Sequence, residues 1–137
     1  MEFLLYLTPI GHQIINRVMM KHYHVLENAP ICRGHSLFGL RNSSNFIICT
    51  DNIKKYDVNS TEFYVNETVY HESVHVAQEC KGDPLGITNI HLSANKMTDV
   101  MNSVKGYNPN GKVIEIEAYS LEDKPEQVLY YLKKFCF

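Results

Sequence analysis

The stretch from residue 69 to residue 78 reads VYHESVHVAQ and contains the pattern His71-Glu72-x-x-His75. Residues four apart lie on one face of an α-helix, a turn from each other, so both imidazoles can bind one metal ion. Glu72 lies beside that face. Its carboxylate can reach a water activated by the ion without binding the ion itself, which suits a general base. The stretch therefore predicts a zinc-dependent hydrolase.

The residues around the pattern predict a helix over residues 66–81. Asn66 is a suitable N-cap, and Glu67 is favourable at the positive end of the helix dipole. Gly82 is a suitable C-cap, and Pro84 stops the helix from continuing. The alternative interpretation is a surface helix that carries two unrelated histidines beside an acid. The compact apolar residues within the stretch favour the buried active-site helix.

Length and composition limit the class of protein. A chain of 137 residues forms one domain, residues 1–137, by the usual size of domains. The net charge is −2, and lysine and arginine never run beyond a pair, which argues against a nucleic-acid partner and against an anionic membrane surface. Apolar runs are also too short to cross a bilayer. We therefore expect an ordinary globular domain.

Four cysteines, Cys32, Cys49, Cys80 and Cys136, are far apart in the sequence and form no C-x-x-C pair. This spacing argues against a zinc ribbon or a thioredoxin-like motif. The first seven residues are apolar but lack the positive charge of a secretory signal. We therefore expect reduced thiols that serve as small core residues in a cytoplasmic protein. Disulfides are the alternative, because the count of cysteines is even.

The first half of the chain predicts one helix and a hairpin. Thr8 and Pro9 are the N-cap and first residue of an amphipathic helix whose apolar residues recur to about residue 28. Residues 36–41 and 46–50 are apolar and β-branched, with a turn between them, and predict a β-hairpin. The polar residues 51–60 predict a loop, and residues 63–65 predict a short extended piece.

The second half predicts three more helices. Ser93 is a suitable N-cap for a helix that includes Met97 and Met101. Residues 106–111 are rich in Gly, Asn and Pro and predict a break. Residues 113–121 then predict a helix, although apolar and acidic residues alternate at its start, and Pro125 opens the last helix. The fold class is therefore α+β and mainly helical.

Two histidines do not complete a catalytic zinc site, which usually has three protein ligands. Glu115 and Glu117 lie about forty residues beyond His75, on the predicted helix of residues 113–121. Such residues are commonly a solvated acidic face, but His71-Glu72-x-x-His75 requires a third ligand from elsewhere in the chain. His91 is a further candidate, either as third ligand or as a donor to the transition state.

The pattern His71-Glu72-x-x-His75 followed by Glu115-Ile116-Glu117-Ala118-Tyr119 resembles the gluzincin metallopeptidases, especially their small, single-domain members. In that family a second helix supplies a glutamate ligand within E-x-x-A-D or E-x-x-x-D. The resemblance, which covers residues 66–121, implies that Glu115 is the third ligand, with Glu117 as the alternative. It also implies that Ala118 is the small residue that lets two helices approach closely.

The resemblance further implies a zincin-like single domain, in which a small antiparallel sheet packs on the HExxH helix. The edge strand of such a sheet can bind an extended substrate by β-addition. Tyr119 stands where the family often has an aspartate that supports a ligand histidine. As a phenol it can form a hydrogen bond there, or Asp99 or Asp123 can serve instead.

We therefore predict a zinc metallopeptidase that hydrolyses a peptide or protein substrate, with Glu72 as general base and one zinc ion as cofactor. The donor to the developing oxyanion is one of five residues: Tyr107, Tyr119, Tyr130, Tyr131 and His91. The alternative is a catalytically weak, zinc-stabilised zincin-like domain that acts as a binding or regulatory protein. A helical interaction protein without metal is a third possibility. The sequence does not predict the substrate, the cleavage specificity or the oligomeric state.

Overall fold

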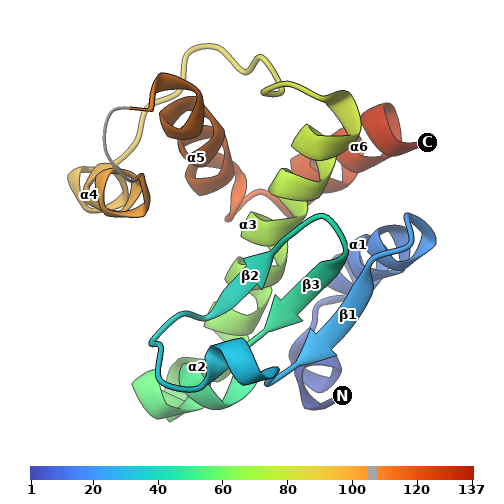
Figure 1. Cartoon of the computed structure of the whole chain (residues 1–137), viewed down its shortest axis with the longest axis vertical. Coiled ribbons are helices and arrows are strands. Elements are labelled where there is room, and N and C mark those ends of the chain that lie inside the picture. Colours follow the sequence, from blue (N-terminus) through green and yellow to red (C-terminus); the bar gives the residue numbers. More distant parts are fainter. Residues whose placement is uncertain (105–107) are drawn as a thin grey trace.

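The helix α3, Thr61–Lys81, is the central element of the fold (Figure 1). The computed structural model describes residues 1–104 and 108–137. The sheet lies on one side of α3, and α4 and α5 lie on the other. Apolar side chains of α3 are buried at several angles around its axis, as expected for a helix packed on most sides; they are Val65, Val69, Val74, Val76 and Ala77.

The helix α3 begins five residues earlier than the sequence predicts. The extended piece predicted at residues 63–65 is wrong, because these residues form its first turns, where Val65 is fully buried. Asn66 is not an N-cap: its buried side chain accepts from Thr8 N at 3.0 Å and donates to Tyr6 O at 2.9 Å. The predicted C-cap is confirmed, since Gly82 adopts a left-handed conformation with φ 79°.

The first long helix, α1, covers Pro9–Met20. Its predicted N-cap is confirmed, because Thr8 Oγ1 accepts a hydrogen bond from Gly11 N at 3.0 Å. The prediction that it continues to residue 28 is wrong: His22 has φ 68°, and the chain then enters the strand β1, His24–Glu27. The apolar residues of that strand continue the three- and four-residue spacing of the helix in the sequence. In the structure, however, they belong to a strand that pairs with residues 45–48.

The sheet has the strand order β1-β3-β2. The strands β2, Gly39–Arg41, and β3, Asn45–Ile48, pair antiparallel, so the predicted hairpin is confirmed. The strand β1 pairs parallel with β3, so the sheet is mixed and the prediction of an antiparallel sheet is wrong. The hairpin pattern in the sequence predicts only β2 and β3, and it gives no indication of β1. Within the described residues, β2 is an edge strand.

The residues predicted as a loop after the hairpin are mostly helical. The helix α2 covers Thr50–Tyr56, and a 3₁₀ turn, η3, covers Val58–Ser60. Ile53 is fully buried and fixes α2 to the core, which the polar composition of the segment conceals. Further 3₁₀ turns cover Glu2–Tyr6 (η1) and Pro30–Cys32 (η2).

The predicted helices of the second half are confirmed. The helix α4, Ala94–Ser103, has Ser93 as N-cap, with Lys96 N donating to Ser93 Oγ at 3.2 Å. The helix α5, Pro109–Leu121, begins earlier than predicted, because Asn108 caps it. Of the break predicted at residues 106–111, residues 106 and 107 lie outside the described residues, and residues 109–111 belong to α5. The last helix, α6, covers Pro125–Cys136 and begins at the predicted proline.

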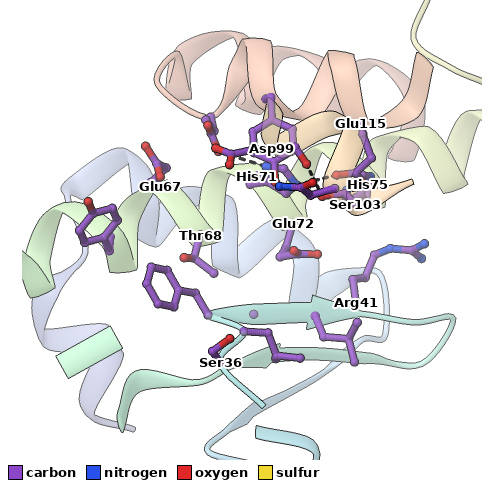
Figure 2. Close-up of a pocket in the computed structure, with 18 of the residues that line it drawn as sticks. Ser36, Arg41, Glu67, Thr68, His71, Glu72, His75, Asp99, Ser103 and Glu115 are labelled. Atoms are coloured by element: carbon purple, nitrogen blue, oxygen red, sulfur yellow. Dashed lines mark hydrogen bonds and ion pairs between the residues drawn. The ribbon is translucent and has the colours of Figure 1, made fainter. Parts of the chain in front are cut away.

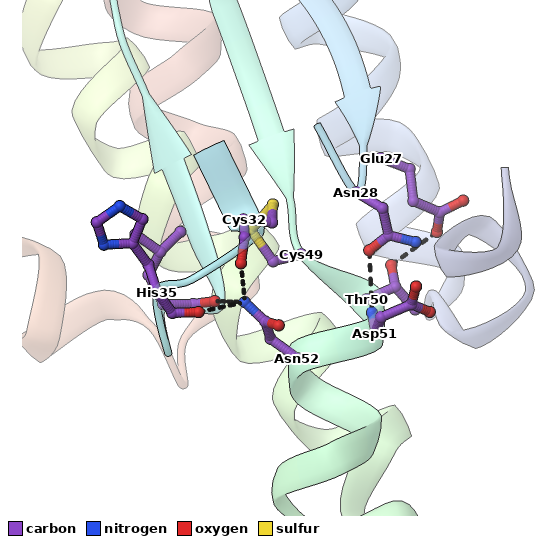
Figure 3. Close-up of a disulfide and its surroundings, with 9 residues drawn as sticks. Glu27, Asn28, Cys32, His35, Cys49, Thr50, Asp51 and Asn52 are labelled. Carbon is purple, nitrogen blue, oxygen red and sulfur yellow. Dashed lines mark hydrogen bonds between the residues drawn. A yellow bond between two sulfur atoms is a disulfide. The ribbon is translucent and has the colours of Figure 1, made fainter. Parts of the chain in front are cut away.

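The four cysteines form two disulfides, so the expectation of reduced thiols is wrong. Cys32 pairs with Cys49, which joins the segment after β1 to the end of β3 (Figure 3), and Cys80 pairs with Cys136, which joins the ends of α3 and α6. Their Cα–Cα distances are 5.6 and 5.2 Å. Folding brings together residues whose sequence spacing gives no sign of it. The disulfides do not establish the compartment, and the cytoplasmic location stays a prediction.

The architecture is thus mainly helical with a small three-stranded sheet packed on α3, as the α+β class predicts. Among the described residues, none of the helices combines the length and apolar character needed to span a bilayer.

Candidate metal centre

The helix α3 presents His71 and His75 toward α5, one turn apart (Figure 2). Their Nε2 atoms face the Glu115 carboxylate of α5: the distance is 3.6 Å from His71 to Oε2 and 2.8 Å from His75 to Oε1. One potential ligand atom of each residue lies within 4.8 Å of the others. The described residues therefore bring together the two histidines of the motif and the preferred third ligand.

The sequence of α5 explains why Glu115 reaches α3. The helices α5 and α3 pack on each other, and Ala118 of α5 is fully buried; a small side chain on a packed helix allows a close approach. Glu115, Tyr119 and Glu122 are spaced by four and three residues, so they share one helical face. That face looks toward the two histidines.

The second ring nitrogen of each histidine has its own partner. His71 Nδ1 lies 3.1 Å from Glu122 Oε2, and His75 Nδ1 lies 2.8 Å from Gln78 Oε1. Both partners accept, so each imidazole donates from Nδ1 and turns its Nε2 atom toward Glu115. Such partners fix the tautomer and the orientation of metal-binding histidines in proteins.

The side chain of Gln78 is itself fixed by hydrogen bonds to α5. Its Nε2 donates to Ile114 O at 3.0 Å and to Glu117 Oε1 at 2.9 Å, both on α5. The side chain therefore joins the ligand histidine of α3 to the second helix. Its position three residues after His75 placed it on the correct face, but the sequence equally allowed simple helix packing.

Glu117, the alternative third ligand, lies outside the three-residue group. Its carboxylate is fully buried and accepts from the backbone N–H groups of Leu85, Gly86 and Ile87 at 2.8 to 3.2 Å. It therefore anchors the loop that follows α3. On α5, two residues correspond to a rotation of about 200°, so Glu115 and Glu117 face different sides of the helix.

The histidines of the site and the carboxylates beside them shift one another's pKa values. Burial alone would lower the pKa of His71, but Glu115 and Glu122 outweigh it and raise that pKa to about 10. Burial raises the pKa of Glu115, but contacts with His71 and His75 prevail and lower that pKa to about 2. The Glu115 carboxylate is thus held in its ionised form between the two imidazoles.

This donor set fits a zinc ion. Two neutral imidazole nitrogens and one carboxylate oxygen are a common catalytic zinc set, and bonds of about 2.0–2.1 Å in a tetrahedron separate the ligand atoms by roughly 3.3 Å. The distances of 2.8 and 3.6 Å between Nε2 and carboxylate atoms bracket that value. With all three ligand atoms within 4.8 Å of one another, these side chains would hold a small divalent cation by drawing together around it.

The group lies at the wall of a cavity of about 900 Å³. Glu72 also lines it and points from α3 toward β2 (Figure 2). The strand comes close at Gly39, where a Cβ atom would lie 3.5 Å from Glu72 Cγ and 2.5 Å from Thr68 Cγ2. Glycine is therefore the residue that allows the edge strand to approach the predicted general base.

Tyr119 also lines the cavity. Its ring packs edge-on against His71, with 4.5 Å between ring centroids, and its hydroxyl lies 3.2 Å from Ser103 Oγ of α4. Burial raises the pKa of this phenol, so it stays protonated and able to donate at neutral pH. Among the interactions of the described residues, it is Glu122 and not Tyr119 that contacts a ring nitrogen of His71, so the supporting role expected for Tyr119 falls to Glu122.

The other residues considered for the site have different positions. The cavity lining does not include His91, Tyr130 or Tyr131, and Tyr107 lies outside the described residues. Asp99 lines the cavity from α4 but contacts neither histidine among the interactions of the described residues. Asp123 is exposed and pairs with Lys124.

Glu122 is the main site residue that the sequence reasoning missed. Its other oxygen, Oε1, lies 3.4 Å from Lys96 Nζ of α4, and Lys96 also donates to Tyr119 O at 3.0 Å. The signal was present, because Glu122 lies two turns after Glu115 on the same face. Lys96 could not be found this way, since its place depends on how α4 packs against α5.

Comparison with known proteins identifies the family. The model of the family described as "Domain of unknown function (DUF8637)" matches residues 3–137, so the chain belongs to this family. We found no match to the chain among curated proteins or among solved structures. The family description names no activity, so a function has to be argued from the site itself.

Proposed function

We propose that this protein is a zinc metallopeptidase of the gluzincin type, with a zincin-like fold, that hydrolyses peptide bonds. The observation that carries the proposal is the convergence of His71, His75 and Glu115 within 4.8 Å, in a cavity that Glu72 also lines. Each histidine is held through its Nδ1 by Glu122 or Gln78, so both Nε2 atoms are oriented in advance. These three side chains would hold the ion.

When bound, zinc supplies a Lewis acid that lowers the pKa of a water and polarises a carbonyl. Glu72 accepts the proton of the attacking water and passes it to the leaving amine, so one carboxylate serves both halves of the reaction. Of the five residues that the sequence suggests as oxyanion donor, Tyr119 is the described one that lines the cavity, where its hydroxyl can stabilise negative charge on the carbonyl oxygen.

The edge strand β2 supports a peptide as substrate. Phe38 O accepts from Cys49 N at 2.8 Å, and Asn42 N donates to Asn45 O at 3.0 Å, so these groups face β3. In an antiparallel pair this direction alternates, so the peptide groups of Gly39 and Arg41 face the open edge. An extended chain can add there, beside Glu72, through backbone hydrogen bonds.

The test combines metal content with turnover. Protein purified without added metal should contain about one zinc per chain and should cleave members of a quenched-fluorescence peptide library. Glu72→Gln should keep the zinc and lose turnover by about 10²–10⁴-fold, because it removes the proton acceptor. Glu62→Gln is the matched control, since Glu62 is exposed at the start of the same helix and should change neither quantity.

Two other results would assign the protein differently. Zinc without turnover in the wild type, and partner binding that Glu72→Gln leaves unchanged, would indicate the zinc-stabilised binding or regulatory domain. Protein without zinc after purification would indicate a helical interaction protein that uses no metal.

A further inference from the structure

Three aromatic side chains form the end of the cavity where β2 begins. Phe38 precedes β2, Tyr56 ends α2, and Tyr64 lies on α3, and all three line the cavity that holds the candidate metal centre. The ring centroids of every pair are 5.4 Å apart, with interplanar angles of 61° to 84°. Edge-to-face packing of this kind forms a rigid apolar surface. We call these three residues the aromatic wall.

The aromatic wall differs from the rest of the cavity, whose lining is largely polar and charged around the histidines. Tyr56 is 66% exposed although it packs on two other rings. Phe63 offers a comparison, because it is 59% exposed and also packs on Tyr64, at 5.1 Å, but it does not line the cavity. The two rings therefore have similar exposure and both pack on Tyr64, but of the two only Tyr56 lines the cavity.

The position of the aromatic wall relative to Glu72 defines what it can bind. Phe38 is adjacent to Gly39, where a Cβ atom would lie 3.5 Å from Glu72 Cγ. Strand residues advance by about 3.3 Å, so a peptide extended along β2 with its scissile bond beside Glu72 has a side chain at the wall within two residues of that bond. The opposite end of β2 differs in chemistry, since Arg41 there forms an ion pair with Glu79.

We propose that Phe38, Tyr56 and Tyr64 form the subsite that determines specificity, and that it binds an aromatic or large aliphatic side chain within two residues of the bond that is cut. This inference rests on the proposed peptidase function. It adds the substrate class, which is peptides with a large apolar residue close to the scissile bond.

The experiment uses pairs of quenched-fluorescence peptides. The two peptides of a pair differ only by Phe or Ala at one position, and a separate pair is made for each of the two positions on either side of the scissile bond. Cleavage gives kcat/KM for wild type, Tyr56→Ala, Tyr56→Phe and the matched control Phe63→Ala. The same peptides are titrated against each variant in the Glu72→Gln background by fluorescence anisotropy, which gives Kd without turnover. Circular dichroism verifies that each variant is folded.

We expect wild type to favour the Phe peptide by about tenfold or more at one of these positions. Tyr56→Ala should reduce that preference to about threefold or less, through a loss on the Phe peptide, whereas Tyr56→Phe and Phe63→Ala should keep it. The Kd values should show the same pattern.

Three outcomes would overturn the inference: equal cleavage of both peptides by wild type, an equal loss on both in Tyr56→Ala, or the same narrowing in Phe63→Ala. Cleavage without any such preference would leave the peptidase function standing. If wild type cleaves no peptide, the peptidase function fails, and the Kd values decide the subsite alone. Tighter binding of the Phe peptide than of the Ala peptide, lost in Tyr56→Ala, would support the subsite. Equal Kd values for the two peptides in the Glu72→Gln background would overturn the subsite.

Discussion

The substitution Gly39→Ala tests how closely the edge strand must approach α3. The added Cβ would lie 2.5 Å from Thr68 Cγ2 and 3.0 Å from Ile47 O, so either the strand or the Thr68 side chain must shift. Forcing an extra methyl group into packed surroundings costs about 1–3 kcal/mol, and the lower backbone entropy of unfolded alanine offsets about 0.4–1 kcal/mol of it. We therefore expect a free energy of unfolding that is about 1–2 kcal/mol lower, measured by urea denaturation.

A double-mutant cycle identifies the cause. Thr68→Ser removes the methyl group that would clash and should cost about 1 kcal/mol alone. In that background Gly39→Ala should cost at least about 1 kcal/mol less than in wild type, with incomplete rescue because Ile47 O stays close. Peptide turnover should follow the same order, since the shift moves β2 away from Glu72. If the losses in free energy of unfolding from the two single substitutions add up, within about 0.5 kcal/mol, to the loss in the double variant, the close approach of β2 to Thr68 is not the reason for glycine at this position.

Three further predictions concern charge, orientation and cross-links. Burial, followed by the charge of Glu122, raises the pKa of Glu67 from 4.5 to about 7, so this group's contribution to stability is complete below pH 4.5 and is lost as the pH rises through 7. In chelator-treated protein, Glu67→Gln should therefore be more stabilising at pH 8 than at pH 4, by about 1–2 kcal/mol after allowance for solvent screening, and equal thermal shifts at both pH values would contradict this. Glu122→Ala should weaken zinc binding about 10–100-fold in a chelator competition, and the exposed neighbour substitution Asp123→Asn should not; equal affinities would exclude an orienting role. Replacing Cys80 and Cys136 with alanine opens a link across 56 residues and should lower the free energy of unfolding by about 4 kcal/mol, so a loss under about 1 kcal/mol would show that the bridge adds little.

The candidate site was largely predictable because its geometry is local to two helices. Four-residue spacing is enough to place His71 and His75 together, and the helical face shared by Glu115 and Glu122 distinguishes Glu115 from Glu117. What the sequence left open depends on packing between elements: the anchoring of a loop by Glu117, and the contact of Lys96 with Glu122.

The fold was less predictable where distant contacts override local preference. The apolar residues of β1 keep a helical period, but left-handed His22 ends α1 and pairing with β3 makes them a strand. The polar segment of α2 is helical because Ile53 is buried in the core. The disulfides likewise depend on residues that only the folded chain brings together. Local signals with a defined backbone conformation, such as the caps at Thr8, Ser93 and Gly82, were predicted correctly.

X-ray absorption at the zinc K-edge, on protein purified without added metal, tests the metal centre most directly. We expect about one zinc per chain, bound by two imidazole nitrogens and by oxygen at about 2.0–2.1 Å, with the imidazole signal lost when His71 and His75 are replaced by alanine. A sample without zinc, or zinc bound by sulfur at about 2.3 Å, would contradict the proposed site.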